Sequence, residues 1–176
     1  MRVKTPSRPS SKQELLVMRI SMDGLIDPST KRSVVVPTLD LHVNPQSIEM
    51  SYRKNITRSR TRGGFVEEHF GDELDVLNIS GSTGGFLGMG TGVTTQERHR
   101  TLAMVNFQEI LALYRNNACV YDQRGIIISQ GYISITWDTY RFNGQFVNFS
   151  WAEEAGSPYR YTFDFSFEVS RTTFVV

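Results

Sequence analysis

The strictest pattern in this chain of 176 residues is an alternation of apolar and polar side chains over residues 159–170. Successive side chains of a β-strand point to opposite faces, so the alternation predicts a strand with one wet face and one buried aromatic face. At about 3.3 Å per residue, this strand would be about 36 Å long. The predicted buried positions are Tyr159, Tyr161, Phe163, Phe165, Phe167 and Val169.

Most of the remaining sequence also has strand-like patterns. Strands or parts of hairpins are predicted over residues 14–22, 33–43, 47–62, 65–70, 73–80, 126–137 and 145–151. Asn143-Gly144 is a strong signal for a type I′ turn between the last two of these strands. The apolar phase changes between Phe146 and Val147, which predicts a β-bulge.

One helix is predicted among these strands, over residues 95–116. Thr94 and Glu97 have the spacing of a capping box, which marks a helix start, and Asn116-Asn117 marks its end. Apolar side chains fall on one stripe of this helix at Ala103, Phe107, Ile110, Leu111 and Tyr114. A single helix among many strands predicts a mainly β, α+β fold, in which the helix closes one face or mouth of a sandwich or barrel.

Length and composition predict one domain over residues 13–176, preceded by a flexible N-terminal segment over residues 1–12. A chain of this length can bury roughly 70% of its extended surface, which allows one substantial core. This N-terminal segment is rich in proline and serine. It has no apolar stretch typical of a signal peptide, so we expect the chain to mature in the cytoplasm. No apolar run approaches the roughly 20 residues that a membrane-spanning helix needs.

The net charge of +1 conceals two oppositely charged parts. Residues 1–62 contain 12 Lys/Arg against 5 Asp/Glu, and residues 63–176 contain 7 against 13. Arg outnumbers Lys by 15 to 4, and Arg is preferred where charges form fixed, partly dry pairs. The chain therefore has the composition of a protein that pairs its charges, either within itself or between copies.

The opposite charges meet at Gly63-Gly64. The basic side chains before this point are Arg53, Lys54, Arg58, Arg60 and Arg62, and the acidic side chains after it are Glu67, Glu68, Asp72, Glu73 and Asp75. Arg58, Arg60 and Arg62 are at alternate positions, so they would share one face of a strand. That face could be solvated, bind nucleic acid or pair with an acidic surface. We favour the third interpretation, with head-to-tail contacts between copies that close into a ring.

A glycine-rich segment over residues 81–93 precedes the predicted helix. It lacks the spacing of a phosphate-binding or dinucleotide-binding loop. We therefore interpret it as a connector, and its apolar residues could dock on a neighbouring subunit. These are Phe86, Leu87 and Met89.

Catalytic and metal-binding signals are weak. Cys119 is the only cysteine and lies between apolar neighbours, which predicts a small core residue rather than a nucleophile. The histidines at positions 42, 69 and 99 lack metal-ligand spacing. We expect no catalytic residues, metal or cofactor, although the acidic run leaves open a wall-degrading or carbohydrate-binding domain that uses Glu67 or Glu68.

Several segments resemble the baseplate and distal-tail proteins of tailed bacteriophages. They are Asn44-Pro45, Tyr52-Arg53-Lys54, the run from Thr61 to Asp75, Gly81-Ser82-Thr83-Gly84, the helix from Asn106 to Asn117 with Val120-Tyr121-Asp122 after it, and the aromatic closing strand. The resemblance extends over about residues 14–172.

This resemblance implies a tail-tube-like fold, with two packed antiparallel sheets and a flanking helix. It also implies a non-enzymatic structural role in the virion tail or baseplate, in a ring, commonly hexameric, around the channel that DNA crosses. The expected partners are copies of the chain, the tail tube, the hub and other baseplate proteins. In such proteins a long hairpin often reaches the neighbouring subunit, and residues 47–70 would match it.

Overall fold

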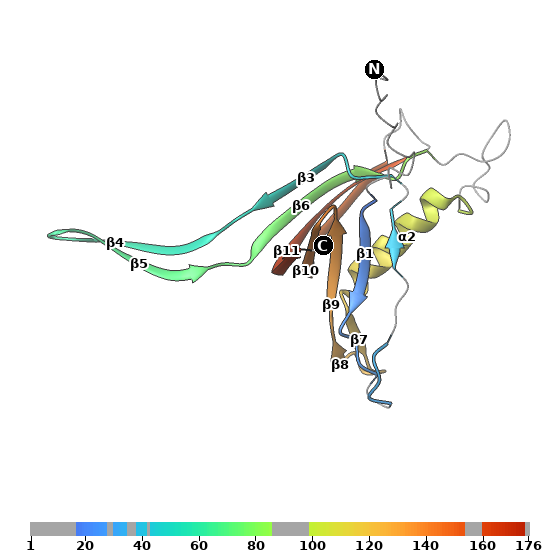
Figure 1. The fold of residues 1–176 in the computed structure, drawn as a ribbon, viewed down its shortest axis with the longest axis horizontal. Coiled ribbons are helices and arrows are strands. Elements are labelled where there is room, and N and C mark those ends of the chain that lie inside the picture. Colours follow the sequence, from blue (N-terminus) through green and yellow to red (C-terminus); the bar gives the residue numbers. More distant parts are fainter. Residues whose placement is uncertain are drawn as a thin grey trace, which may run out of the picture.

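The computed structural model describes residues 17–27, 30–34, 38–41, 43–85, 99–153 and 160–174. Within this part of the chain, seven antiparallel strands form one large sheet (Figure 1). Their order across the sheet is β2 (Leu39–Asp40), β1 (Arg19–Asp23), β9 (Tyr132–Trp137), β10 (Tyr140–Glu153), β11 (Tyr161–Phe174), β6 (Asp75–Ser82) and β3 (Ser47–Ser51).

Two ribbons extend away from this sheet, each made of two antiparallel strands. They are the pair β4 (Lys54–Thr61) and β5 (Gly64–Asp72), and the pair β7 (Cys119–Tyr121) and β8 (Ile127–Gln130). The predicted mainly β architecture with a flanking helix is confirmed. The described residues form one large sheet and two ribbons, so the predicted sandwich or barrel stays a prediction.

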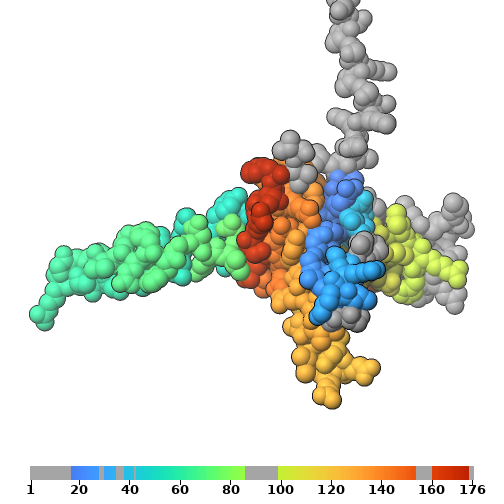
Figure 2. Space-filling model, turned by 60° about the horizontal axis from the view of Figure 1, so that its bottom comes forward, coloured from blue at the N-terminus to red at the C-terminus, as the bar shows by residue number. Residues whose placement is uncertain are grey.

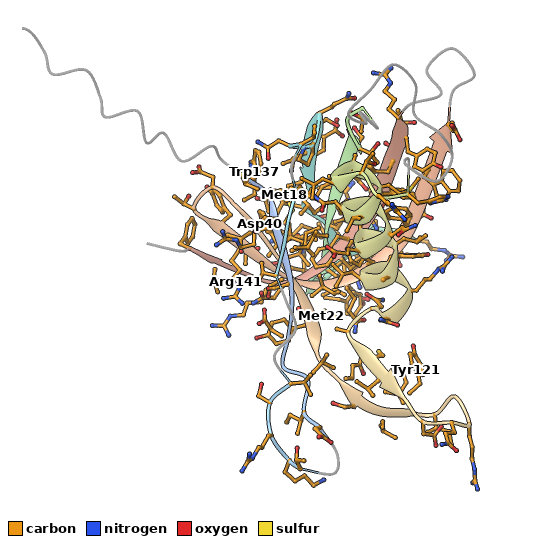
Figure 3. All side chains as sticks on the ribbon, turned by 90° about the vertical axis from the view of Figure 1, so that its right-hand side faces the viewer. Met18, Met22, Asp40, Tyr121, Trp137 and Arg141 are labelled. Carbon is orange, nitrogen blue, oxygen red and sulfur yellow. The ribbon has the colours of Figure 1, made fainter. Side chains whose placement is uncertain are left out.

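The core lies between one face of the large sheet and the helix α2 (Leu102–Asn116), which lies along that face (Figure 3). Ile110 and Leu113 of the helix pack with the buried side chains of the sheet, among them Phe165 and Phe167. The strict alternation of the last strand is confirmed from Phe163 to Val169, where every apolar side chain is buried. Burying this aromatic face is the main favourable contribution to folding.

The helix begins later than the sequence pattern predicts. Residues 99 and 100 form a turn, and Thr101 is the N-cap, whose side chain accepts a hydrogen bond from the Met104 amide. The predicted capping box at Thr94 and Glu97 lies outside the described residues. The predicted end is confirmed, because Asn117 is the C-cap, in the left-handed conformation that asparagine tolerates.

The predicted turn at Asn143-Gly144 is wrong. Both residues lie inside β10, and the turn between β9 and β10 is Asp138-Thr139, with Asp138 at a φ of 54°. Gly144 instead lies at a shift in register against β11, where a Cβ atom would come within 1.8 Å of the Glu168 carbonyl oxygen. The glycine is therefore needed for the close approach of two strands, and a sequence pattern cannot distinguish that need from a turn.

Three further predictions have different outcomes. The register shift between Phe146 and Asn148 confirms the predicted bulge. The strand predicted over residues 126–137 divides at Gly131 into β8 and β9, which belong to different sheets. Cys119 is only half-buried, whereas its neighbour Ala118 is completely buried, so the core position is one residue earlier than predicted.

Candidate assembly interface

The most distinctive surface is the ribbon formed by β4 and β5, which we call the arm. It continues from β3 and β6 and projects far from the rest of the chain (Figures 1 and 2). Every residue of both strands is exposed. No described residue covers either face of the arm, and an isolated two-stranded ribbon is only marginally stable in water.

Local sequence explains how the arm turns and twists. The tip is Arg62-Gly63, and the Thr61 hydroxyl donates a hydrogen bond to the Gly64 carbonyl oxygen at 3.1 Å. Near the base, the register shifts where Gly71 has a φ of 98°, the combination typical of a glycine bulge. At the base itself, the Glu73 amide donates to the Arg53 carbonyl oxygen at 3.2 Å.

Several of the predicted basic and acidic residues face each other within the same arm. Arg58 Nε lies 2.8 Å from Glu67 Oε1, and Lys54 forms an ion pair with Asp72. His69 Nε2 lies 3.8 Å from the other oxygen of Glu67. Part of the predicted complementarity is thus used inside one copy, where exposed pairs contribute about 0–1 kcal/mol each.

Other charges of the predicted set form no ion pair with any described residue. On the arm these are Arg60, Arg62 and Glu68, and at its base they are Arg53, Glu73 and Asp75. The arm therefore has surplus positive charge near its tip. The apolar residues Phe86, Leu87 and Met89, also predicted as contacts, lie outside the described part of the chain.

Strand register divides the arm into two faces. Residues directly opposite each other share a face, so Ile56, Arg58 and Arg60 lie beside His69, Glu67 and Phe65 respectively. The other face carries Thr57, Ser59 and Thr61 on β4. Glu67 and Glu68 point to opposite faces because they are adjacent in a strand, so they cannot act together on one bond as the two carboxylates of a glycosidase do.

A second feature, not predicted from the sequence, is an acidic hollow on the face of the sheet away from α2. Its volume is about 200 Å³, and its rim carries Glu49 from β3 and Asp164 from β11. Hydroxyl and amide residues make up most of the remaining lining, together with the apolar Ile79 and Phe165; the polar ones are Ser47, Asn78, Ser80, Asn148 and Ser166. Register brings these residues together, because Glu49 is opposite Asn78, which is opposite Ser166.

The same face of the sheet carries a polar network across β1, β9 and β10. The Arg141 guanidinium donates to Asp23 at 2.7 Å and to the Ser134 hydroxyl at 3.3 Å. Burial alone would raise the pKa of Asp23, but hydrogen bonds from Ser134, Arg141 and Ser21 and the charge of Arg141 hold that pKa below its usual range. Nearby, Arg19 pairs with Asp40 at 2.7 Å. Because Arg19 and Arg141 already have carboxylate partners, we interpret this network as one that stabilises the sheet.

The described residues contain neither a cluster of metal ligands nor a membrane-spanning helix. No group of three or more His, Cys, Asp or Glu side chains there could hold a metal ion. His42 lies outside these residues, and His69 is on the exposed arm. None of the described helices is long and apolar enough to span a bilayer.

Comparisons with known proteins give structural matches only. No family model matches the chain, and neither does any curated protein. Among solved structures, a sheath/tube terminator of an extracellular contractile injection system matches at 10% identity and a TM-score of 0.38, covering 99% of this chain and 100% of that one. The tail of an empty gene transfer agent particle matches at 10% identity and a TM-score of 0.39, with 95% and 100% covered. The tube-terminating cap of an anti-feeding prophage matches at 12% identity and a TM-score of 0.37, with 98% and 93% covered.

Proposed function

We propose that this chain is a non-enzymatic structural subunit of a phage tail or phage-tail-like particle. Copies of it would associate through the arm into a closed ring around the tail channel. The ring would connect the tail tube to the hub or baseplate, and DNA would pass through it only as cargo. Six copies is the number that the resemblance to baseplate and distal-tail proteins implies.

The observation that carries this proposal is the complete exposure of the arm. Folding the arm fixes the backbone of both strands, which costs roughly 1–2 kcal/mol per residue, and no apolar side chain of the arm is buried in return. Association with a neighbouring copy would supply the missing burial and would pair the free strand edges. The arm extends directly from two strands of the large sheet, so it is well placed to link one body to the next.

The resemblance supplies the particle in which such association is useful. The segments that carry the resemblance include both ends of β4, the tip of the arm, the whole of β5 and the junction with β6. Tail rings need subunits that bind copies of themselves head to tail, and a protruding arm on one side of a subunit is suited to contacts of this heterologous kind. A tail-tube-like arrangement of two packed sheets, and assembly in the host cytoplasm before incorporation into the virion, are parts of the same proposal.

A nucleic-acid role for the arginine strip has less support. Arg58, in the middle of the strip, already pairs with Glu67, and Glu68 lies on the opposite face of the same ribbon. Binding to phosphates needs unpaired cations that displace the counterions condensed on the nucleic acid, and carboxylates beside those cations oppose the approach of a polyanion. Association between copies uses both signs of charge.

The test is removal of the arm without loss of the sheet. Ser51 is opposite Val76, so Tyr52 and Asp75 can be joined by Asn-Gly in place of residues 53–74, as a two-residue hairpin. We expect the full chain to form closed rings by native mass measurement and negative-stain imaging, and the armless chain to be monomeric. Thermal unfolding of both chains checks that the body still folds. Rings with the same number of copies from the armless chain would refute an arm-mediated assembly.

A further inference from the structure

The acidic hollow raises the question of what satisfies its charges. Glu49 and Asp164 on its rim, and Glu168 further along β11, form no ion pair with any described residue. Glu168 and Asp164 lie on the same face of the strand as Ser166, because side chains two apart in a strand share a face. Three unpaired carboxylates therefore lie on the surface around β3, β6 and β11.

The lining of the hollow is rich in hydrogen-bond acceptors. Carboxylate, amide and hydroxyl oxygens from two strands on each side converge there. A guanidinium has five donors and no acceptor, and it binds carboxylates in a fixed planar geometry, so this lining matches an arginine head better than an anion or an apolar group. The volume of about 200 Å³ exceeds that of a single water, which is about 30 Å³ in the liquid, and leaves room for such a head.

The arm carries the complementary groups near its tip. Arg60 and Arg62 have no carboxylate partner among the described residues, and Phe65, opposite Arg60, is 73% exposed. The arm leaves the body from β3 and β6, the strands that form one side of the hollow, and it points away from them (Figure 1). Its arginines therefore cannot reach the hollow of their own copy, whereas those of a second copy can.

We propose that the acidic hollow, with Glu49, Asp164 and Glu168, is the docking surface for the arm tip of a second copy. This inference rests on the proposed arm-mediated assembly and names its receiving surface. Arg60 and Arg62 bind the carboxylates, and Phe65 packs at the rim. The contact is heterologous, since tip and hollow are different surfaces, so repeating it generates a ring or a stack.

Charge reversal with rescue tests this pairing. Reversing the tip (Arg60→Glu with Arg62→Glu) is expected to weaken association at least about tenfold, because like charges then face each other. Reversing the hollow (Glu49→Arg with Asp164→Arg) is expected to do the same. The chain with all four substitutions restores opposite charges and is expected to recover association to within about threefold of the original. Association is measured by sedimentation across a dilution series at fixed salt.

Matched controls use charges of the same kind elsewhere on the surface. Arg124→Glu in the turn between β7 and β8, and Glu109→Arg on the exposed side of α2, change the net charge without touching tip or hollow. Both are expected to associate normally. The proposed docking surface is wrong if the tip reversal prevents assembly while the hollow reversal does not. It is also wrong if the chain with all four substitutions shows no recovery of association. In either case arm-mediated assembly still stands. If the armless chain still assembles, the proposed function itself is wrong.

Cross-linking gives a measurement that does not depend on charge-reversed variants folding. In a Cys119→Ser background, one chain carries Arg60→Cys and a second carries Asp164→Cys. Mixing them under mild oxidation is expected to give a disulfide-linked dimer of the two chains. Thr57→Cys, on the other face of the arm, replaces Arg60→Cys as the control and should give much less product. Equal products from both positions, or none from Arg60→Cys, would overturn the proposed contact.

Discussion

The large sheet and the arm are built from the same kind of antiparallel ladder, yet they bury very different surfaces. In β11 the side chains of Phe163, Phe165 and Phe167 are at most 2% exposed, and Phe146 of β10 packs edge-on against Phe165 and Phe167. In the arm no residue of either strand is buried. Backbone pairing alone is therefore not what distinguishes a stable sheet from a projecting ribbon.

This contrast leads us to expect that residues of the large sheet determine the stability of the chain and residues of the arm determine the proposed assembly. The body is stabilised by apolar burial, which is strong and is not weakened by charge screening. The arm is held by its backbone hydrogen bonds and by exposed ion pairs, which are weak and screened by salt. Substitutions in the body should change the free energy of unfolding, whereas equivalent substitutions in the arm should leave the monomer folded and change only association.

The largest expected effect comes from a matched pair of phenylalanines. Phe167→Ala removes a completely buried ring and should lower the free energy of unfolding by about 3–5 kcal/mol. Phe65→Ala removes a ring that is 73% exposed and should change it by less than about 0.5 kcal/mol. Urea unfolding of the monomeric protein measures both. A comparable loss at Phe65 would show that the arm is packed in the free chain.

A pair of glycines gives the next largest difference. Gly144→Ala places a methyl group 1.8 Å from the Glu168 carbonyl oxygen, so two adjacent strands must move apart, at a cost of about 1–3 kcal/mol. Gly63→Ala at the arm tip meets nothing within 4 Å, and its φ is not in the left-handed region, so stability should hardly change. Thermal unfolding of the two variants tests this contrast. Equal melting temperatures would remove the explanation given for Gly144.

The ion pair of the body should give a smaller, pH-dependent effect. Asp23 has a lowered pKa in the folded chain, so its contribution is present above the unfolded pKa of about 3.9 and is lost as the pH falls through the folded value. Asp23→Asn should reduce the free energy of unfolding at pH 7 by about 1–2 kcal/mol. In urea unfolding across pH, the difference between the variant and the original should shrink as the pH falls below 3.9 and vanish below the folded pKa of Asp23. A constant difference at all pH values would mean that the charge of Asp23 is not what stabilises the network.

How much of this structure the sequence predicts depends on whether a feature is local. The alternation in β11 and the helix end at Asn117 follow from neighbouring residues; the first is confirmed from Phe163 to Val169, and the second is confirmed as well. The prediction of a turn at Asn143-Gly144 fails because Asn-Gly is a stronger local signal than Asp138-Thr139. No neighbouring residue indicates that Gly144 lies against Glu168.

The candidate site divides in the same way. The arm strands and their charges could be predicted, because residues 47–62 and 65–70 are polar, strand-like segments on either side of Gly63-Gly64. The pairing of Arg58 with Glu67 needs the register of the hairpin, which the composition does not give. The acidic hollow combines Glu49 with Asp164, which are far apart in the sequence. Only the strand order β11-β6-β3 brings them together.

The smallest expected effect tests whether arm and body unfold separately. Arg58 and Glu67 have side chains 67% and 45% exposed, so their pair should contribute about 0–1 kcal/mol to the arm and nothing to the sheet. In amide hydrogen exchange on the monomer, arm amides should exchange far faster than those of β11, because local opening of the arm exposes no core. Arg58→Ala should then speed exchange in the arm by up to about fivefold, with β11 unchanged. Equal acceleration in both regions would mean that arm and sheet open as one unit, and the distinction between a stable body and an assembly arm would fail.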